Sequence, residues 1–269
     1  MTRRLPGWLR AWGLSGARVL DELTEHGDRS RAWRVRADDG DYVAKLTFDV
    51  PAFVEPGLRI AAALDRAGIT TGAPVPTVTG SLCRRVRRWP GGWTLALLEF
   101  VEGRPIDWTT PDAPEFCGDL LGSVHRTLCG LDDRPEPAGR LLDFYAAEAA
   151  RIGGPRGGAL ADAVAAVCAF DRRAGLTQGV LYGDPAPEVL RDDRGGAPAL
   201  IDWGTPSWGP LLHDLVSWKL FAAERNPGDP GVGPRLVAAY RARMPVEDTE
   251  LAGQELFVDL HRAIQAAWV

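Results

Sequence analysis

The sequence predicts an α+β protein in two lobes, a small antiparallel β-sheet followed by a larger and mainly helical part. Two observations support this fold class. Apolar and polar residues alternate through much of the first part of the chain, whereas apolar residues recur at helical spacing in most of the remainder. The change falls at the linker Glu102–Pro105. A chain of 269 residues can bury two cores, so we place the first lobe at residues 1–102 and the second at residues 103–269.

The first lobe is predicted to consist mainly of hairpins. Runs of alternating apolar residues that flank a turn-rich segment such as Asp38–Asp41 are typical of antiparallel strand pairs. Helical spacing interrupted by glycine, and a proline at a helix start, indicate the exceptions. In chain order, the predicted elements are a helical segment over residues 1–25 with a break at 13–16, and a hairpin over 32–48. A helix over 55–67, with Pro56 in its first turn, and a second hairpin over 82–101 follow.

The second lobe is predicted to be helical except for one hairpin. Its helical segments each place apolar residues on one face. They cover residues 111–128, 141–151, 159–170, 211–223, 234–243 and 248–268. Between the third and fourth helices lie two short apolar runs, 181–190 and 200–203, joined by the turn Asp192–Gly196.

Three carboxylates lie at the ends of those two short runs. Asp184 and Glu188 lie in Leu181–Leu190, a stretch that two prolines keep out of helix, and Asp202 ends an Ala-Leu-Ile run. A hairpin across the intervening turn would bring these acids together. Clustered carboxylates repel one another unless a cation lies between them, so the pattern indicates a divalent metal.

Lysine is rare in this chain, which draws attention to Lys45. Among 31 basic residues only Lys45 and Lys219 are lysines, and Lys45 lies within the apolar strand pattern Tyr42–Leu46. A lysine at the edge of a strand and a functional lysine facing the carboxylates both remain open on this evidence.

Composition and charge exclude several classes of protein. A net charge of −5 argues against nucleic-acid binding, although a mildly acidic surface would tolerate or attract a cationic substrate. The four cysteines are scattered, which argues against a zinc site or a disulfide framework and favours a reducing, cytoplasmic location. We find no apolar segment with the pattern of a signal peptide or a membrane span.

The motifs, taken together, resemble those of the aminoglycoside phosphotransferase superfamily, which includes choline kinases. Leu181–Glu188 resembles its H-G-D-x-x-x-x-N motif, and Leu200–Trp203 followed by Trp208–Leu215 resembles its I-D-W/F-E and G-D-P-x-x-D-L-A segment. Tyr42–Lys45 resembles its nucleotide-binding lysine strand. The resemblance covers essentially the whole chain in the right order, and it implies a bilobal protein-kinase-like fold.

The resemblance implies roles for the acids. Asp184 would accept a hydrogen bond, and then the proton, from the substrate hydroxyl. Asp202 and Glu188 would hold Mg²⁺ at the phosphates, and Asp214 would brace the hairpin from the following helix. The local alternatives are a turn-capping Asp184, a strand-end Asx turn at Asp202, a solvated loop acid at Glu188 and an exposed helix-start acid at Asp214. His125, on an apolar helix face, is predicted to be structural.

The resemblance also implies where the nucleotide, ATP or GTP, would bind. Lys45 would contact the phosphates, and the adenine edge would pair with the Glu99 carbonyl and the Val101 amide. Glu55 either pairs with Lys45 or is a helix N-terminal acid favoured by the helix dipole. Ser30, at the end of the glycine-poor loop that begins at Glu25, either reaches a phosphate or belongs to a plain turn.

Three departures from the family pattern leave two functions open. Tyr182 stands where the family usually has histidine, the loop after Asp184 is one residue short, and Glu188 falls where the family usually has asparagine. The first function is a kinase that phosphorylates a hydroxyl of an aminoglycoside-, amino alcohol- or sugar-like acceptor. The second is a catalytically silent nucleotide-binding protein of the same fold. The expected partners are nucleotide and a small acceptor, with no nucleic acid or membrane, in a monomer or a homodimer.

Overall fold

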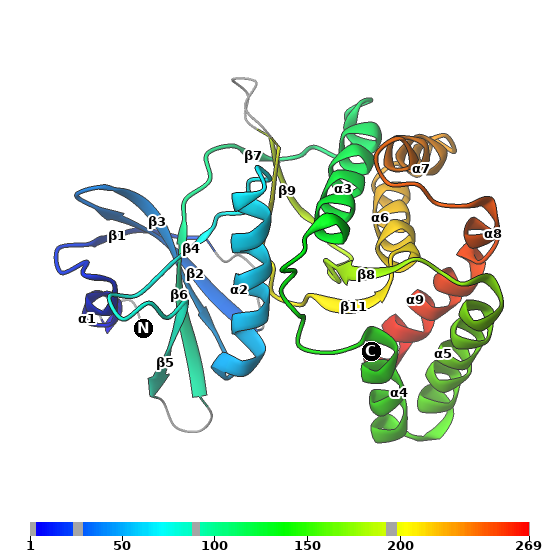
Figure 1. Ribbon diagram of the computed structural model, residues 1–269, viewed down its shortest axis with the longest axis horizontal. Helices are drawn as coiled ribbons and strands as arrows, with labels where there is room; N and C mark the ends of the chain where they lie inside the picture. The colour runs from blue at the N-terminus through cyan, green and yellow to red at the C-terminus, as the bar shows by residue number, and fades with distance from the viewer. Residues whose placement is uncertain (1–3, 24–28, 88–91, 192–197, 269) are drawn as a thin grey trace. The chain divides into compact units, whose positions relative to one another are not determined.

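The structure is a computed structural model that describes residues 4–23, 29–87, 92–191 and 198–268 (Figure 1). It has the α+β character predicted, with an antiparallel sheet in one part and mostly helices in the other. The chain divides into two compact units, one comprising Met1–Arg104 with Leu190–Gly204 and the other Pro105–Val189 with Thr205–Val269. The segment Leu190–Gly204 therefore belongs to the first unit, although the sequence placed it in the second lobe. Its attachment includes a hydrogen bond from the Leu200 amide to the Thr70 carbonyl.

The first unit is built on one antiparallel sheet, and both predicted hairpins are present. The strand order is β1-β2-β3-β6-β4, with β5 also paired to β6. The strands are β1 (Arg18–Glu22), β2 (Ser30–Ala37), β3 (Gly40–Thr47), β4 (Pro74–Val75), β5 (Cys83–Arg87) and β6 (Gly92–Glu99). In the first hairpin Ala32 lies opposite Lys45, and on the other side of β3 Lys45 lies opposite Ala96.

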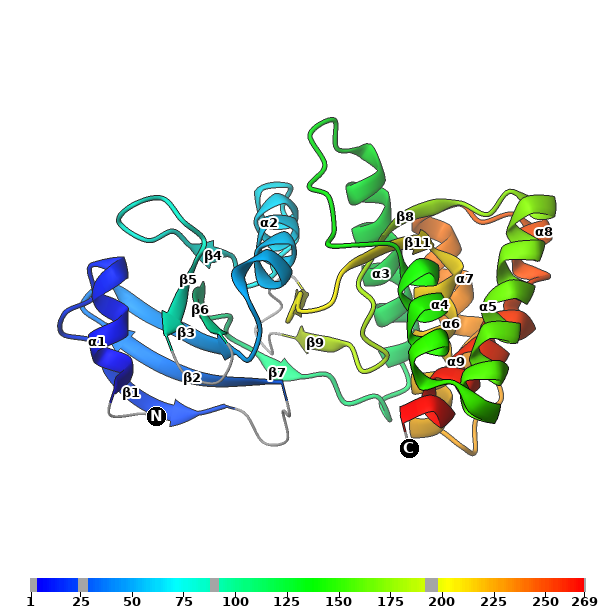
Figure 2. The same ribbon diagram turned by 90° about the horizontal axis from the view of Figure 1, so that it is seen from below.

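The two faces of this sheet are covered by different helices, as Figure 2 shows. One face carries the main core of the unit, where alternate strand residues such as Trp33, Ala44 and Leu46 pack against α1 (Leu5–Leu9) and the 3-10 helix that follows it. The opposite face packs a smaller cluster, which includes Ala96, against Leu58 of α2 (Pro51–Arg66). Because strand side chains alternate between faces, Lys45 lies on the face opposite to its buried neighbours Ala44 and Leu46.

Two predictions for the first unit are wrong in detail. The segment Arg18–Glu22 was predicted to be helical, but it forms the edge strand β1, which pairs antiparallel with β2. The apolar residues of this segment recur at helical spacing, but its backbone pairs with that of β2 instead. Helix α2 begins at Pro51 rather than at Pro56, and both prolines lie within it. Pro51 suits the first helical position because proline has no amide hydrogen to satisfy there.

The second unit consists of helices with one short two-stranded ribbon. The helices are α3 (Ala113–Gly130), α4 (Leu141–Ile152), α5 (Gly154–Ala174), α6 (Leu212–Arg225), α7 (Val232–Arg243), α8 (Asp248–Leu251) and α9 (Gln254–Trp268). The ribbon pairs β8 (Gln178–Leu181) with β11 (Ser207–Pro210), a strand that the sequence did not predict.

A further small sheet has the order β10-β9-β7, from β10 (Ala199–Ile201), β9 (Glu188–Arg191) and β7 (Arg104–Pro105). The predicted acidic hairpin is thus the pair β9–β10, and its predicted turn, Asp192–Gly196, lies outside the described residues.

The last predicted helix is interrupted. The sequence indicated one helix over 248–268, but α8 ends at Leu251 and α9 begins at Gln254. Gly253, in the break, lies against the ring of Phe170, and an added side chain there would overlap that ring. None of the helices in the described ranges is long and apolar enough to cross a membrane.

Candidate active site

The first unit brings Lys45 into contact with Asp202. The Nζ atom of Lys45, on β3, donates a short hydrogen bond to Oδ1 of Asp202, which follows β10, and the two residues are 157 positions apart in the sequence. Strand β3 is flanked by β2 and β6, so Lys45 is not at the edge of the sheet. Its side chain is 16% exposed, whereas that of Asp202 is 40% exposed. The functional interpretation of Lys45 therefore fits the structure better than the edge-lysine alternative.

Asp202 adopts an unusual backbone conformation. Its φ angle is +63°, and among the described residues it is the only non-glycine residue with a positive φ. A residue held in this left-handed region costs about 1–3 kcal/mol, and such strain gathers at functional sites. The following turn is closed by a hydrogen bond of 2.8 Å from the Gly204 amide to the Asp202 carbonyl. This turn directs the carboxylate toward the ammonium group of Lys45.

Two other predicted nucleotide contacts are not brought to this pair. Glu55, on α2, accepts hydrogen bonds from Arg59 one helical turn later, the shorter being 2.7 Å, and forms its ion pair there rather than with Lys45. Ser30 begins β2 opposite Thr47. Most of the loop from Glu25 to Ser30 lies outside the described residues, so its role stays a prediction.

The segment predicted to pair with adenine is fixed by backbone and ionic contacts. The Glu99 amide donates to the Ala73 carbonyl at 2.9 Å, and the Phe100 amide donates to the Asp41 carbonyl at 3.3 Å. Val101 follows directly in the chain. These bonds tie the segment to the sheet that carries Lys45, so the predicted adenine contacts and the predicted phosphate contact belong to one unit.

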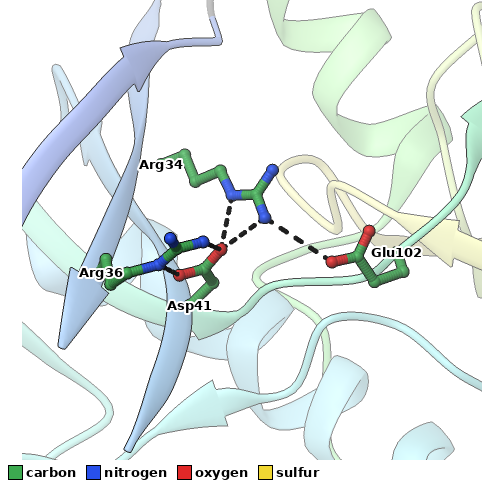
Figure 3. A network of polar contacts seen from close by, with 4 residues as sticks. All are labelled: Arg34, Arg36, Asp41 and Glu102. Carbon is green, nitrogen blue, oxygen red and sulfur yellow. Dashed lines mark hydrogen bonds and ion pairs between the residues drawn. The ribbon is translucent and has the colours of Figure 1, made fainter. Parts of the chain in front are cut away.

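A network of charged side chains strengthens the same segment, and the sequence did not reveal it (Figure 3). Asp41 accepts hydrogen bonds from Arg36 at 2.6 Å and from Arg34 at 2.8 Å, and these bonds hold the pKa of the Asp41 carboxyl well below its usual value. Arg34 also pairs with Glu102 at 3.6 Å, and its guanidinium stacks over the Phe100 ring. The alternation of β2 and β3 was visible in the sequence, but which charges meet depends on the register of the strands.

The second unit holds the loop that carries Asp184. Gly183 has a φ of +78°, and a side chain at this position would clash with the Thr205 carbonyl oxygen, so only glycine fits before Asp184. The Asp184 carboxylate accepts a hydrogen bond of 3.0 Å from the Ala186 amide. Asp184 therefore caps this turn, as the local alternative predicted. The hydrogen bond orients the carboxylate, but it does not show which chemical role the carboxylate has.

Tyr182 and Glu188 meet at the two ends of this loop. Tyr182 is 1% exposed, and its ring packs edge-on against Trp218. Its hydroxyl accepts a hydrogen bond of 3.3 Å from the Glu188 amide. The side chain of Glu188, the first residue of β9, is exposed. Tyr182 therefore supports the shortened loop through its hydroxyl as well as its ring.

Asp214 anchors the start of the same loop. It lies in the first turn of α6, is 1% exposed, and accepts hydrogen bonds from the amides of Tyr182 at 2.6 Å and Gly183 at 3.1 Å. The alternative of an exposed helix-start acid is wrong, because the carboxylate is buried and bonded to the loop backbone. The role that the family resemblance implies for Asp214 matches these contacts.

The predicted metal ligands lie in different units, Asp202 in the first and Glu188 in the second. A shared metal therefore stays a prediction. Within the part of the chain that the structure describes, no group of three or more histidine, cysteine or acidic side chains forms a metal cluster. Both residues supply carboxylate oxygens, and Asp202 already faces a cation, so their chemistry fits Mg²⁺ with further ligands from phosphates and water.

A pocket beside the Asp184 loop was not predicted. Its volume is about 130 Å³, and it is lined by Pro185, Ala186, Ser217, Phe221, Glu224, His261 and Gln265. Burial lowers the pKa of His261, and the charge of Glu224 opposes that shift. Trp218 of α6 does not line it, because this side chain is fully buried and packs against Tyr182 and Trp108. Residues from α6 and α9 converge here only through tertiary packing, and no spacing in the sequence signals this.

The comparisons with known proteins agree with this arrangement of motifs. Residues 22–251 match the family described as "Phosphotransferase enzyme family". Among curated proteins, no sequence matches the chain. Several solved structures share its fold, and the three described next are 13–19% identical to it, so the likeness is one of fold.

An amicoumacin kinase, hAmiN, solved with AMP-PNP, Ca²⁺ and Ami, has a TM-score of 0.74 at 13% identity, over 99% of this chain and 86% of the other. A microcompartment-associated aminopropanol kinase has a TM-score of 0.73 at 19% identity, over 100% and 89%. The aminoglycoside phosphotransferase APH(3'')-Id from Streptomyces rimosus ATCC10970 has a TM-score of 0.64 at 18% identity, over 97% and 96%.

The family match spans most of the chain and includes β3, the Asp184 loop and the Asp202 turn. The fold is that of the protein-kinase-like enzymes in this comparison. The chain therefore belongs to the phosphotransferase enzyme family.

Proposed function

We propose that the protein is a Mg²⁺-dependent small-molecule kinase that transfers the γ-phosphate of ATP, or of GTP, to a hydroxyl of an amino alcohol-, aminoglycoside- or sugar-like acceptor. The observation that carries this proposal is the contact between Lys45 and Asp202 across 157 positions of sequence. Phosphoryl transfer depends mainly on positioning and on neutralising phosphate charge. One ammonium and one carboxylate held side by side supply the two groups that a metal–triphosphate requires.

In the nucleotide complex, Lys45 would exchange its partner. Its ammonium would contact the α- and β-phosphates as a point charge, and the Asp202 carboxylate would turn to the metal. Mg²⁺, when bound, supplies neutralisation of the charge on the β- and γ-phosphates. Glu188 is the second proposed protein ligand, and the Glu99 carbonyl and Val101 amide are the proposed contacts of the base. These assignments rest on the motif positions and on the anchoring of each segment described above.

Asp184 is the proposed group that accepts the proton of the acceptor hydroxyl. A carboxylate suits this task because the proton can move late, once the hydroxyl oxygen is bonding to phosphorus. The loop that carries Asp184 is anchored at its start by Asp214 and at its end by Tyr182. Such anchoring keeps a reacting group in place and so lowers the entropic cost of the step.

The pocket beside this loop is the proposed acceptor site. It offers one carboxylate, Glu224, together with the polar groups of Ser217, His261 and Gln265 and the aromatic face of Phe221. A carboxylate and an aromatic ring suit a protonated amine. The name of one structural neighbour, an aminopropanol kinase, supports an amine-bearing acceptor.

We place this reaction in the cytoplasm, where nucleoside triphosphates are abundant. The cysteines fit that assignment, since none of Cys83, Cys117, Cys129 and Cys168 forms a disulfide. The oligomeric state that we expect is a monomer or a homodimer.

The test is an acceptor screen. The protein is incubated with Mg²⁺ and either ATP or GTP, together with amino alcohols, amino sugars and aminoglycosides, and release of the nucleoside diphosphate is followed. Acceptor-dependent release with at least one compound supports the proposal. Stabilisation of the fold by nucleotide without turnover on any acceptor would instead support the silent nucleotide-binding protein, as suggested by Tyr182, Glu188 and the short loop.

A further inference from the structure

An arginine of β2 is stacked on the aromatic ring that follows β6. The guanidinium of Arg34 lies over the Phe100 ring, with 3.9 Å between its central carbon and the ring centroid. Its Nε atom donates a hydrogen bond of 2.8 Å to Oδ2 of Asp41, near the start of β3 (Figure 3). The backbone carbonyl of Asp41 in turn accepts the Phe100 amide at 3.3 Å. Arg34, Asp41 and Phe100 therefore link three neighbouring strands of the sheet.

The register of the strands places this stack on the sheet face that carries Lys45. Arg34 lies opposite Val43, which is two residues before Lys45 on β3. Opposite residues share a face and every second residue returns to it, so Asp41, Val43 and Lys45 follow one another on that face. At about 3.3 Å per residue, Asp41 lies about 13 Å along the strand from Lys45. A nucleotide whose phosphates contact Lys45 can span this length, which would bring its base to the end of the face where Arg34 lies.

Arg34 contacts both neighbours of Val101. Beside its stacking on Phe100, it forms an ion pair with Glu102, in which Nη2 lies 3.6 Å from Oε1. Phe100 and Glu102 are the residues directly before and after Val101. The base of the nucleotide is proposed to bind at the Glu99 carbonyl and the Val101 amide. The contacts of Arg34 therefore fix the backbone segment that carries both groups.

The three contacts of Arg34 differ in strength. Its own side chain is 26% exposed and that of Asp41 is 13% exposed, whereas that of Glu102 is 67% exposed. An exposed ion pair contributes little, so the bond to Asp41 and the stack on Phe100 carry most of the effect. Arginine suits this place because its planar guanidinium can lie flat on a ring while its edge pairs with a carboxylate.

We propose that Arg34 is a positioning residue for the nucleobase. Oriented by Asp41, it holds the segment Glu99–Glu102 in the conformation that presents one carbonyl and one amide to the base. A segment that is already fixed in its bound conformation loses less freedom on binding, which raises the affinity for nucleotide. The inference rests on the proposed function in one respect, that the phosphates bind at Lys45 and the base at this segment.

The test compares two substitutions of arginine by methionine on β2, each of which removes a charge but keeps an apolar stem. Arg34→Met removes the stack on the aromatic ring. Arg31→Met is the matched control, because Arg31 pairs with Glu22 of β1 at 3.3 Å and lies three residues from Arg34, which places it on the opposite face. Arg31 also lies opposite Leu46, next to Lys45, so a general loss of positive charge near the phosphates would weaken nucleotide binding in both variants.

Nucleotide affinity is the first readout. The dissociation constant of Mg²⁺–ATP, measured by calorimetry, and the KM for ATP should both rise about tenfold in Arg34→Met, the scale of one partly buried cation–π contact. GTP replaces ATP if the parent uses GTP. The kcat should stay near that of the parent, because the reacting groups are not touched, and Arg31→Met should bind nucleotide like the parent. Equal dissociation constants in the two variants, or a fall in kcat with an unchanged KM, would overturn the proposal.

Amide hydrogen exchange at Phe100, followed without nucleotide, provides a second readout that does not need binding. The amide should exchange faster in Arg34→Met than in Arg31→Met and in the parent. If the parent binds no nucleotide, the proposed function fails, but this comparison still decides whether Arg34 fixes the segment. Unchanged exchange in Arg34→Met would overturn the inference.

A phenylalanine pair covers the case in which Arg34→Met does not fold. Phe100→Leu removes the ring under the guanidinium but leaves every charge in place, and it should raise the dissociation constant of the nucleotide several-fold. Phe48→Leu is the matched control, since Phe48 is an aromatic residue of the same unit that packs on Trp93. Equal affinities in these two variants would contradict the positioning role.

Discussion

Tyr182 supports the Asp184 loop with its phenol hydroxyl, which contacts the backbone at the other end of this loop. The family pattern that this chain resembles usually has histidine at this position, and here a phenol hydroxyl accepts the Glu188 amide instead. Tyr182→Phe removes that hydroxyl and leaves the ring against Trp218. We expect a loss of about 0.5–1.5 kcal/mol in stability, the usual contribution of one hydrogen bond. We also expect more Mg²⁺ to be needed for half-maximal rate, because Glu188 would be less well placed, and a metal titration of the initial rate measures this.

The matched variant for that experiment is Glu188→Asn, which restores the residue type usual in the family. If Glu188 binds the metal, both variants shift the Mg²⁺ requirement. A shift in neither would remove Glu188 from the metal site, and a shift in Glu188→Asn alone would show that the Tyr182 hydroxyl is dispensable.

His213 is a buried titratable residue that makes stability depend on pH. Burial lowers its pKa to about 4, because the interior disfavours the charged imidazolium, and Nδ1 has no hydrogen-bond partner among the described atoms. The unfolded chain then binds the proton more tightly than the folded one. The stability that neutral His213 contributes is therefore present above the pKa of this residue in the unfolded chain. It is lost as the pH falls toward the pKa of His213 in the folded protein. Linkage predicts a loss of about 2 kcal/mol between pH 7.5 and pH 5 from this residue.

Urea unfolding of His213→Leu at both pH values tests this prediction. An apolar side chain cannot take up the proton, so the variant should lose less stability on acidification than the parent by about that amount. His261→Leu is the companion variant, since the pKa of His261 is also lowered by burial but its side chain is only partly buried. Parallel pH profiles for the parent and His213→Leu would contradict the assignment.

The residues of the site differ in how far the sequence could define them. Lys45 and Asp202 were identified by a rare residue type in a strand pattern and by an acid at the end of a strand, and both signals are local. Glu55 was predicted either to pair with Lys45 or to be a helix N-terminal acid, and neither prediction named its actual partner, Arg59, one helical turn later. The family resemblance predicted a bracing role for Asp214. Only the tertiary structure shows that Asp214 also contacts His125, which in turn contacts Tyr240.

At the scale of elements, strong periodicity was reliable and weak or interrupted periodicity was not. The hairpins β2–β3 and β5–β6 and the long helices α3 to α7 lie close to their predicted ranges. Strand β1 was missed because an edge strand with few apolar residues can match helical spacing by chance. Gly253, in the break between α8 and α9, lies against the ring of Phe170, and no local pattern encodes such a distant contact. The pocket beside the Asp184 loop was missed for the same reason.

The contact between α3 and α7 leads to a prediction about stability. Gly118→Ala would place a Cβ against the Leu236 carbonyl and the Ala239 side chain, so the helices must move apart. Overpacking of this kind costs about 1–3 kcal/mol. Gly158→Ala is the matched control, because Gly158 is an exposed helical glycine of α5 with no atom within 4 Å of the added Cβ. That change should stabilise the protein by up to about 1 kcal/mol through helix propensity.

Thermal or urea unfolding of both variants gives the answer. If Gly118→Ala is as stable as the parent, the close approach of α3 and α7 is not as described.

At the scale of the whole molecule, the chain passes between its two units at three points, after Arg104, after Val189 and after Gly204. The short excursion Leu190–Gly204 carries Asp202 into the unit that contains Lys45 and the Glu99–Val101 segment. Asp184, Tyr182 and Asp214 stay in the other unit. Under the proposed function, the residues that hold nucleotide are therefore largely separate from those that act on the acceptor.

This separation predicts opposite effects for two matched substitutions of aspartate by asparagine. Asp184→Asn should abolish turnover but keep nucleotide binding, because its unit holds the acceptor side. Asp202→Asn should weaken binding of the Mg²⁺–nucleotide complex, and asparagine tolerates the left-handed backbone found at this position. Nucleotide at about 100 times its Kd stabilises a fold by about 2.7 kcal/mol. The rise in melting temperature with Mg²⁺ and nucleotide should therefore persist in Asp184→Asn and shrink in Asp202→Asn, and a full rate in Asp184→Asn or an unchanged rise in Asp202→Asn would refute the division.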